Sequence, residues 1–500
     1  MKTKRAKRVF LIYFFVVIPG LFYLAQSNIG YFIERRMKKN NIEVESTGAE
    51  FSLFSRTVFF ERLHVVSPQL GELTCTNLAI KKIGLLSLFA ARGFAAEEVS
   101  LDTLSIELNF LPDSLMAANK DKGAIDIFVG DWDVAHGSVD LMQKDSSHLT
   151  LAFATNSLQY EAGVGANKGE VTVSQLVYDI HQNSSTARVD TIRIDLNTGN
   201  LSAQNITWKS QLTKKEYARK YPYQKGRLSL SIPDLIVKGL DLSQMHADKG
   251  IQCQRIDIDT CHLLSYKNKR LPFGDKPDQK LIADWIQSAP VKFQIDTVSI
   301  VKSTIVHEEL FPDASAPGKV SFTNLYATLY HISSMDQKPL VMDAQAVLLG
   351  QGKLKAHFEL NSSPIPCRVS GELGAMDFAQ ANSMTIPGVG LEIRSGRLQH
   401  LDFAFQYQAQ ESSGRMNMHY EDLTFRLIDP ETRDQSRQQE VSSFLANVFI
   451  VRKSNDPNKN NYREGDISFE REAKKSEFAY WWKSVLSGIK SSVGIDRVSS

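Results

Sequence analysis

The sequence has no excess of charge of either sign. Its 500 residues include 58 Lys and Arg against 56 Asp and Glu, which leaves a net charge of +2. A protein that binds nucleic acid through bulk positive charge needs a larger basic surplus, so we expect no nucleic-acid partner. Apolar residues make up 42% and charged residues 23%. That balance excludes a mostly disordered chain and allows a large buried core.

Cysteine is scarce, and the common motifs of catalytic and metal sites are missing. The four cysteines include no C-x-x-C pair. If Cys253 and Cys261 lie on one strand, they are about 26 Å apart, too far for a disulfide. The eleven histidines are never within four residues of one another, and there is neither a G-x-S-x-G motif nor a P-loop. We therefore predict no enzyme, no cofactor, no catalytic residue and no metal site, although ligands distant in sequence could still converge.

Long apolar runs are also missing, except at the N-terminus. Five of the first eight residues are basic, and the next 17 carry no charge. Such a run spans about 25 Å as a helix, close to the ~30 Å hydrocarbon core of a bilayer. We predict a cytoplasmic tip at residues 1–8, a transmembrane anchor at 9–26 and a juxtamembrane helix at 27–40, with the rest of the chain exported. A cleaved signal peptide, with a mature terminus near Asn28, and a buried core helix are the alternatives.

From residue 41 onward, apolar residues recur mainly with a period of two. The clearest alternating stretches are residues 228–232, 354–360, 401–407 and 416–420. Alternation is typical of antiparallel sheets with one covered face, whereas parallel α/β sheets have unbroken apolar runs. Long amphipathic helices between these stretches are missing, which excludes alternating α/β folds. We predict a mainly β fold over residues 41–470, built as an elongated, twisted antiparallel sheet with a few short helices.

A weak internal repeat interrupts the alternation. The pattern apolar-x-x-apolar-x-apolar occurs at residues 101–106, 189–194 and 295–300, each time with Asp-Thr in the two inner positions. The extra residue moves the apolar series to the other face unless the strand bends, so the pattern predicts a β-bulge or a bend. A ligand site at Asp-Thr is the alternative interpretation.

The last 30 residues predict an amphipathic C-terminal helix and tail at 471–500. Its apolar stripe consists of Phe478, Trp481, Trp482, Val485, Leu486, Ile489 and Val493. The adjacent tryptophans Trp481 and Trp482, flanked by lysines, would suit a membrane interface. The alternative is a helix that covers the open end of the sheet.

One segment, residues 214–225, combines five basic residues with three tyrosines. It could contact anionic lipid headgroups, or it could be a solvated loop.

Three parts of the chain resemble AsmA-like proteins. Residues 42–68 and 73–108 resemble the N-terminal unit of that family, in which a membrane anchor leads into strands, a Ser-Leu turn and a return strand. Residues 414–429, 442–457, 463–472 and 478–495 look like the C-terminal portion of AsmA-like proteins from the Bacteroidota. Residues 267–309 and 318–332 fit the same group. The resemblance covers most of residues 9–495 and rests on the order of these patterns.

The resemblance implies an inner-membrane anchor and a periplasmic sheet that curls into an apolar groove, similar to bridge-like lipid-transfer proteins. The implied function is phospholipid transport between the inner and outer membranes, or outer-membrane assembly, with lipid and outer-membrane assembly proteins as partners. A non-transporting scaffold and a polysaccharide-binding surface protein are the alternatives. Alternation is the same for a groove and for a closed core, so each candidate lipid-contacting residue could belong to either. These candidates are Leu101, Ile106, Ile192, Ile194, Leu230, Ile256, Ile295, Ile300, Phe403, Phe405 and Phe425.

Overall fold

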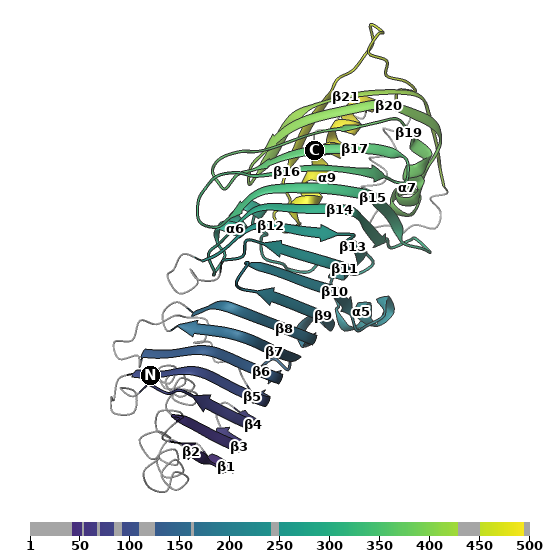
Figure 1. Ribbon diagram of the computed structural model, residues 1–500. Helices are drawn as coiled ribbons and strands as arrows, with labels where there is room; N and C mark the ends of the chain where they lie inside the picture. The colour runs from purple at the N-terminus through teal and green to yellow at the C-terminus, as the bar shows by residue number, and fades with distance from the viewer. Residues whose placement is uncertain are drawn as a thin grey trace. The chain divides into compact units, whose positions relative to one another are not determined.

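The computed structural model describes most of the chain after the predicted anchor. It covers residues 43–52, 55–67, 71–84, 93–109, 126–161, 165–241, 250–428 and 451–494. These residues fall into two compact units. The N-terminal unit contains the described residues up to Gln211 together with Asp234–Cys253, and the C-terminal unit contains Leu212–Pro233 and the described residues from Gln254 on. Strands dominate both units and form a twisted, mostly antiparallel sheet in each, which confirms the predicted fold class at this level (Figure 1).

The N-terminal unit is almost entirely strands that follow one another in chain order. Its elements are β1 (Glu43–Thr47), β2 (Glu50–Ser52), β3 (Thr57–Ser67), β4 (Gly71–Lys81), β5 (Gly93–Leu108), β6 (Asp126–Met142), β7 (His148–Glu161), β8 (Gly165–Ile180), the 3-10 turn η1 (His181–Asn183), β9 (Ser185–Asp195) and β10 (Asn200–Ser210). Each strand from β3 to β10 pairs with the next. Only β5 and β6 are parallel in this series.

The C-terminal unit adds short helices to its sheet. Strands β11 (Gly226–Lys238) and β12 (Ile251–Asp259) contribute to both units. The remaining elements are α5 (Lys214–Lys220), β13 (His262–Asn268), α6 (Ile282–Gln287), β14 (Phe293–Leu310), β15 (Gly318–Ser333), β16 (Leu340–Leu348), β17 (Gly352–Leu360), β18 (Cys367–Leu373), β19 (Met376–Asp377), η3 (Phe378–Ala381), α7 (Asn382–Val389), β20 (Leu391–Tyr407), β21 (Glu411–Leu427), β22 (Gly465–Glu470) and α9 (Glu477–Val493). Among the pairs with a defined register in this unit, only β13–β14 is parallel.

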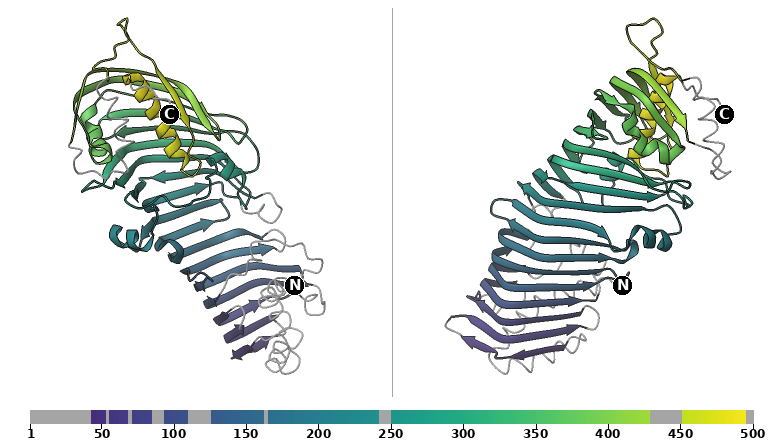
Figure 2. Two further views of the ribbon diagram at one scale, coloured as in Figure 1. Left: turned by 180° about the vertical axis from the view of Figure 1, so that it is seen from behind. Right: turned by 90° about the vertical axis from the view of Figure 1, so that its right-hand side faces the viewer.

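Two of the three Asp-Thr pairs are tied to an asparagine on the neighbouring strand. Asn77 of β4 donates a side-chain hydrogen bond to Asp102 at 2.6 Å, and Asn205 of β10 donates one to Asp190 at 2.8 Å. Both asparagines have a positive φ, 50° and 53°, a conformation that Asn tolerates better than most residues. In β5 the exposed pair Asp102-Thr103 separates the buried Leu101 and Leu104, so the apolar series stays on one face through the bend. Bent strands are visible in Figure 2. The pairing keeps its register across Asp102 and Asp190, so neither corner is a β-bulge.

Two clusters of buried apolar side chains form the cores. The N-terminal cluster extends from β1 to β6 and includes Phe60, Ile80 and Val99. The C-terminal cluster lies mainly on β16–β22 and includes Met416, Met418 and Tyr420, which are fully buried. All four cysteines are free, so neither core depends on a disulfide.

Helix α9 lies across one face of the C-terminal sheet (Figure 2). Its cap is Ser476, whose side chain accepts a hydrogen bond from the backbone N–H of Ala479, and it ends at Gly494 with a left-handed φ. The predicted helix is therefore confirmed, but its most buried face is not the apolar stripe. Small residues such as Ser484, Gly488 and Ser492 are buried instead. Because their side chains are small, the helix backbone can approach β21 and β22 closely.

The parallel pair β13–β14 requires a crossover connection. Residues 269–292 form it, and we call residues 271–281 the strap. The strap is tied to the segment before α9: Asp275 pairs with Lys474 at 2.6 Å, and Gln279 N–H donates to the Ala473 carbonyl at 2.8 Å. It leads into α6, whose Ala283 and Ile286 join the C-terminal core.

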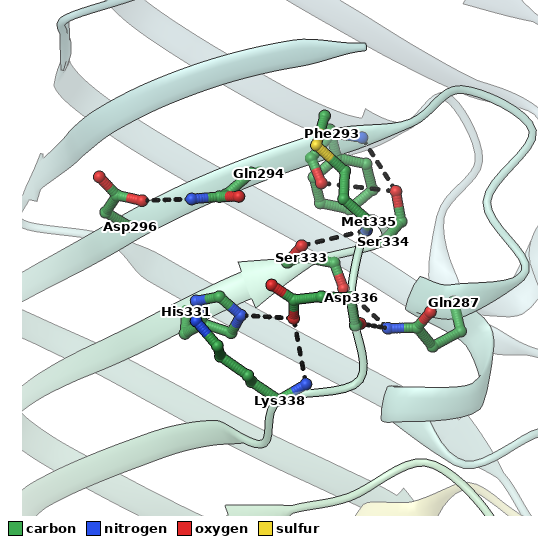
Figure 3. A network of polar contacts seen from close by, with 10 residues as sticks. All are labelled: Gln287, Phe293, Gln294, Asp296, His331, Ser333, Ser334, Met335, Asp336 and Lys338. Atoms are coloured by element: carbon green, nitrogen blue, oxygen red, sulfur yellow. Dashed lines mark hydrogen bonds and ion pairs between the residues drawn. The ribbon is translucent and has the colours of Figure 1, made fainter. Parts of the chain in front are cut away.

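A polar network fixes α6 against the turn between β15 and β16 (Figure 3). Gln287 donates to the Ser333 carbonyl at 3.0 Å, and the Ser334 hydroxyl accepts from the Phe293 N–H at 2.9 Å. His331, which has a positive φ of 59°, contacts Asp336 at 2.7 Å. The hydrogen bond from His331 lowers the pKa of the Asp336 carboxyl and outweighs burial, which acts in the opposite direction. The members of this network satisfy one another, so it holds the turn and offers no free ligand group.

The predicted transmembrane anchor at 9–26 and the juxtamembrane helix at 27–40 lie outside the described residues. Within the described ranges, no helix combines the length and the apolar character that a membrane crossing requires.

Candidate functional site

In the N-terminal unit, one row of apolar side chains runs across eight consecutive strands. Residues paired in register share a face of the sheet, so the row can be followed from strand to strand. It consists of Leu63, Cys75, Leu104, Gly137, Phe153, Val173, Ile192 and Ala203. A second row on the same face consists of Leu101, Val134, Thr155, Val171, Ile194 and Leu201. We call this surface the N-terminal apolar face.

The cover over this face changes along the rows. Leu63 and Leu104, at the β3–β5 end, are buried in the N-terminal core. Phe153, Val173 and Ile192, on the interior strands β7–β9, are only half-buried. Among the described residues of this unit the only helical element is the turn η1, so no described helix lies over β7–β9. Apolar side chains that stay partly accessible on interior strands are expected of a binding surface.

Glycines in the rows make room for aromatic rings. A Cβ on Gly137 would overlap the ring of Phe153, its partner across the strands. In the C-terminal unit, a Cβ on Gly371 would lie 2.6 Å from the ring of Phe403, which is again its paired neighbour. In both units, the aromatic ring therefore fills the space that a side chain on the paired residue of the neighbouring strand would occupy, and only glycine fits there.

The C-terminal unit has an equivalent apolar face. Its accessible row consists of Leu230, Leu263, Ile305, Phe322 and Leu348, all of them half-buried. Helix α9 borders this row, because the ring of Phe478 meets that of Phe322 edge-on, with 6.5 Å between centroids. Phe478 and Trp482 remain 53% and 48% exposed, so the apolar stripe of α9 adds to the accessible apolar surface.

Further along the same face, the rows enter the core beneath α9. One row passes through Val298, Leu329, Met342, Phe358, Val369 and Phe405, and the next through Ile300, Ala327, Ala344, Ala356, Gly371, Phe403 and Met416. Trp481 of α9 packs on Phe358 at 4.7 Å, and Tyr480 packs on Tyr407 at 5.3 Å. The helix therefore covers one part of the face and leaves the β11–β15 part less covered.

The eleven predicted groove residues all lie on strands, but their accessibility differs. Ile192, Ile194, Leu230, Ile256, Ile295 and Ile300 are half-buried. Leu101, Phe403 and Phe405 are buried in the two cores, and Ile106 and Phe425 pack against those cores. Contact with a ligand therefore stays a prediction for the first group. For Phe403 and Phe405 it would require α9 to move.

The two tryptophans predicted at a membrane interface are separated by the packing of α9. Trp481 lies against the C-terminal core, whereas Trp482 is exposed. Contact between α9 and the sheet agrees with the covering-helix interpretation. A membrane contact through Trp482 stays a prediction.

The basic segment at 214–225, for which a headgroup contact and a solvated loop were the alternatives, begins as the helix α5. Thr213 and Glu216 form a complete capping box, and the Tyr217 hydroxyl donates to the Gly226 carbonyl at 2.9 Å. The solvated-loop alternative is therefore wrong for residues 214–220, where the Thr-x-x-Glu sequence at positions 213–216 starts a helix.

The C-terminal apolar face ends in a charged rim. Two residues beyond Leu263 and Ile305 on the same face come Ser265 and His307, and then the paired residues Lys267 and Glu309. Glu309 is tied to Lys269 at 2.5 Å and to His307 at 3.2 Å. Burial by itself would raise the pKa of Glu309, but the hydrogen bonds and charges of His307 and Lys269 outweigh it and lower the pKa to about 2.

We expect this carboxylate to make the protein sensitive to acid. Because the pKa of Glu309 falls from 4.5 to about 2 on folding, its contribution to stability is present above pH 4.5 and is lost as the pH falls towards 2. The Glu309→Gln variant should be less stable than the native protein by about 2–3 kcal/mol at pH 7. Denaturant unfolding at a series of pH values measures this difference. A difference that stays constant down to pH 3 would contradict the ion-pair assignment.

Neither the rim nor several residues of the rows were predicted from the sequence. Lys267, Phe273 and Lys276 were not predicted as site residues, although the basic residues on both sides of Phe273 in KNKRLPFGDK were a visible signal. Leu263, Ile305 and Phe322 are apolar residues in alternating stretches, but only strand register shows that they form one row.

No protein-family model matches this chain, and no curated protein sequence matches it. The resemblance to AsmA-like proteins therefore stays a prediction carried by the residues quoted above.

Proposed function

We propose that this chain is a membrane-anchored periplasmic protein that binds phospholipid along the apolar faces of its sheets. One observation carries the proposal: the apolar rows continue from buried cores onto interior strands where the side chains are only half-buried. In a closed sandwich a second layer would cover these positions. Acyl chains are the occupant whose shape suits a row of apolar side chains one strand apart.

The energetics favour such an occupant. Each methylene group transferred from water to an apolar surface contributes about 0.8 kcal/mol. A row of six to eight side chains about 4.8 Å apart is longer than a typical acyl chain, so one face offers contacts over the whole chain length. At the Asp-Thr corner of β5, Leu101 and Leu104 stay on one face of the sheet, so the apolar surface is continuous along the strand.

The cellular role rests on the N-terminal sequence and the family resemblance. An inner-membrane anchor at residues 9–26 would hold the sheets in the periplasm, where bound phospholipid could pass between the inner and outer membranes or assist outer-membrane assembly. A scaffold for outer-membrane assembly factors that carries no lipid is the competing role.

A charge placed on the N-terminal apolar face should expel lipid. Ile192 and Arg193 are neighbours on β9 that point to opposite faces, so Ile192→Glu and Arg193→Glu add the same carboxylate on either side of the sheet. We expect Ile192→Glu to lower the amount of bound phospholipid several-fold, because a buried carboxylate against acyl chains is costly. Arg193→Glu should have little effect.

The measurement is lipid mass spectrometry on the full-length chain, purified in detergent and then exchanged into detergent-free polymer. Circular dichroism checks that both variants keep their strands. Equal phospholipid in both variants would contradict binding on this face. A native protein that carries no phospholipid would overturn the proposed function and favour the scaffold.

A further inference from the structure

Three lysines gather around one aromatic ring at the rim of the C-terminal apolar face. The Nζ atoms of Lys267, Lys276 and Lys475 lie 5.5, 4.8 and 5.9 Å from the centroid of Phe273. They come from three separate segments: β13, the strap and the stretch before α9. Like charges repel, so the fold brings these ammonium groups together at a cost.

The carboxylates nearby are already engaged by other cations. Glu309 pairs with Lys269 and His307, and Glu472 pairs with both Lys475 and Lys483. Among the described residues, no ion pair joins a carboxylate to Lys267 or Lys276. Lys276 donates to the Gln224 carbonyl, which supplies a dipole but no charge.

The surroundings of both lysines are unfavourable for a cation. Burial, followed by the charge of Lys276, lowers the pKa of Lys267, and attraction by Glu309 offsets this only in part. Burial also lowers the pKa of Lys276. An anion bound between these groups would remove the repulsion and accept hydrogen bonds from the ammonium groups.

The location connects this cluster to the apolar row. Lys267 lies on the same face of β13 as Leu263, four residues away, and Leu263 begins the accessible path to Ile305 and Phe322. A ligand with its apolar part on that row would therefore place a polar group beside Lys267. The strap holds Phe273 and Lys276 there through its ties to Gln224 and Lys474.

We propose that Lys267, Lys276 and Lys475 form a phosphate-binding site at the rim of the C-terminal apolar face, beside Leu263. The site takes the phosphate of an amphipathic ligand whose acyl chains lie along Leu263, Ile305 and Phe322. This assignment rests on the proposed function for the lipid part, whereas the phosphate chemistry follows from the lysines alone.

The test compares ligands that differ only in the phosphate. Dihexanoyl phosphatidic acid, dihexanoylglycerol and inorganic phosphate are titrated into the full-length protein in detergent by calorimetry. We expect phosphatidic acid to bind the native protein at least about ten-fold more tightly than dihexanoylglycerol. The double variant Lys267→Gln/Lys276→Gln should lose that difference and keep its affinity for dihexanoylglycerol.

Two further variants serve as references. Lys353→Gln removes an exposed lysine on β17. Its neighbour Leu354 lies on the apolar face, so Lys353 points to the other face. We expect this variant to bind all three ligands as the native protein does. Ile305→Glu should lower the affinity for both lipids without abolishing the binding of inorganic phosphate. Thermal unfolding checks that each variant is folded.

The outcomes separate the site from the function. If the double variant binds phosphatidic acid as the native protein does, the phosphate site is overturned and lipid binding stands. If the native protein binds neither lipid, the proposed function is overturned and inorganic phosphate decides: binding that depends on both lysines identifies a free-phosphate site, and no binding overturns the site. If inorganic phosphate binds as tightly as phosphatidic acid, the site binds free phosphate, and its assignment to an amphipathic ligand is overturned.

Discussion

Replacing Glu477 by alanine should release α9 from the sheet and destabilise the C-terminal unit by about 2–3 kcal/mol. Glu477 is buried in the first turn of α9. It accepts a hydrogen bond from the Tyr407 hydroxyl and one from the Ile282 N–H at 2.5 Å, so it ties α9 both to β20 and to the start of α6. Alanine would leave the buried Tyr407 hydroxyl without its acceptor.

The measurement is denaturant unfolding combined with hydrogen exchange of peptides from α9. We expect faster exchange across residues 477–493 in Glu477→Ala, with little change in the N-terminal unit. Glu477→Gln is the matched control, because its amide oxygen can accept from the Ile282 N–H while its NH2 group donates to the Tyr407 hydroxyl oxygen, and it should lose less than about 1 kcal/mol. Native-like exchange of α9 in the alanine variant would show that Glu477 does not hold the helix.

The same residue predicts a pH dependence of opposite sign to that of Glu309. Burial raises the pKa of Glu477 above 4.5, and the hydrogen bonds from Tyr407 and Ile282 offset this only in part. Burial and the charge of Glu477 raise the pKa of Tyr407, so Tyr407 stays the donor. The contribution of Glu477 to stability is therefore greatest below pH 4.5 and declines as the pH rises through its raised pKa. Glu477→Gln should remove this decline.

Replacing Gly465 by valine should force α9 away from β22, with an expected loss of about 3 kcal/mol. A Cβ at Gly465 would overlap the Gly488 carbonyl oxygen and the Ser492 hydroxyl, both on the buried face of α9. The helix side of this contact is equally tight, since a Cβ at Gly488 would lie 2.8 Å from Ile467 Cγ1. The backbone atoms involved cannot rotate away as a side chain could.

Gly226→Val is the control for this substitution. Gly226 is also in a strand, and nothing lies within 4 Å of a Cβ built on it. We expect that variant to remain within about 0.5 kcal/mol of the native protein. Thermal unfolding and the total tryptophan fluorescence, to which Trp481 packed against Phe358 contributes, report on both variants. Equal stability of the two valine variants would contradict the close helix–sheet contact.

Much of the fold could be predicted because strand physics is local. The alternation at 401–407 and 416–420 became β20 and β21, and the helical stripe beginning at Phe478 became α9. The Asp-Thr pattern at 102–103 and 190–191 predicted a bend, since an extra residue between apolar positions must be absorbed by the backbone. The asparagines that complete these corners, Asn77 and Asn205, were not predicted, because they lie on neighbouring strands.

The sequence by itself determined that the chain is mainly β, that each strand has one apolar side, and that a helix follows the last strand. Only the tertiary structure decided which parts of the apolar faces are covered. Leu104 and Ile192 alternate in the same way, yet one is buried and the other half-buried. It also decided that small residues of α9 meet the sheet and that Lys267, Lys276 and Lys475 surround Phe273. The physical reason is that alternation reflects the local backbone period, whereas cover and charge clustering depend on contacts between residues far apart in the chain.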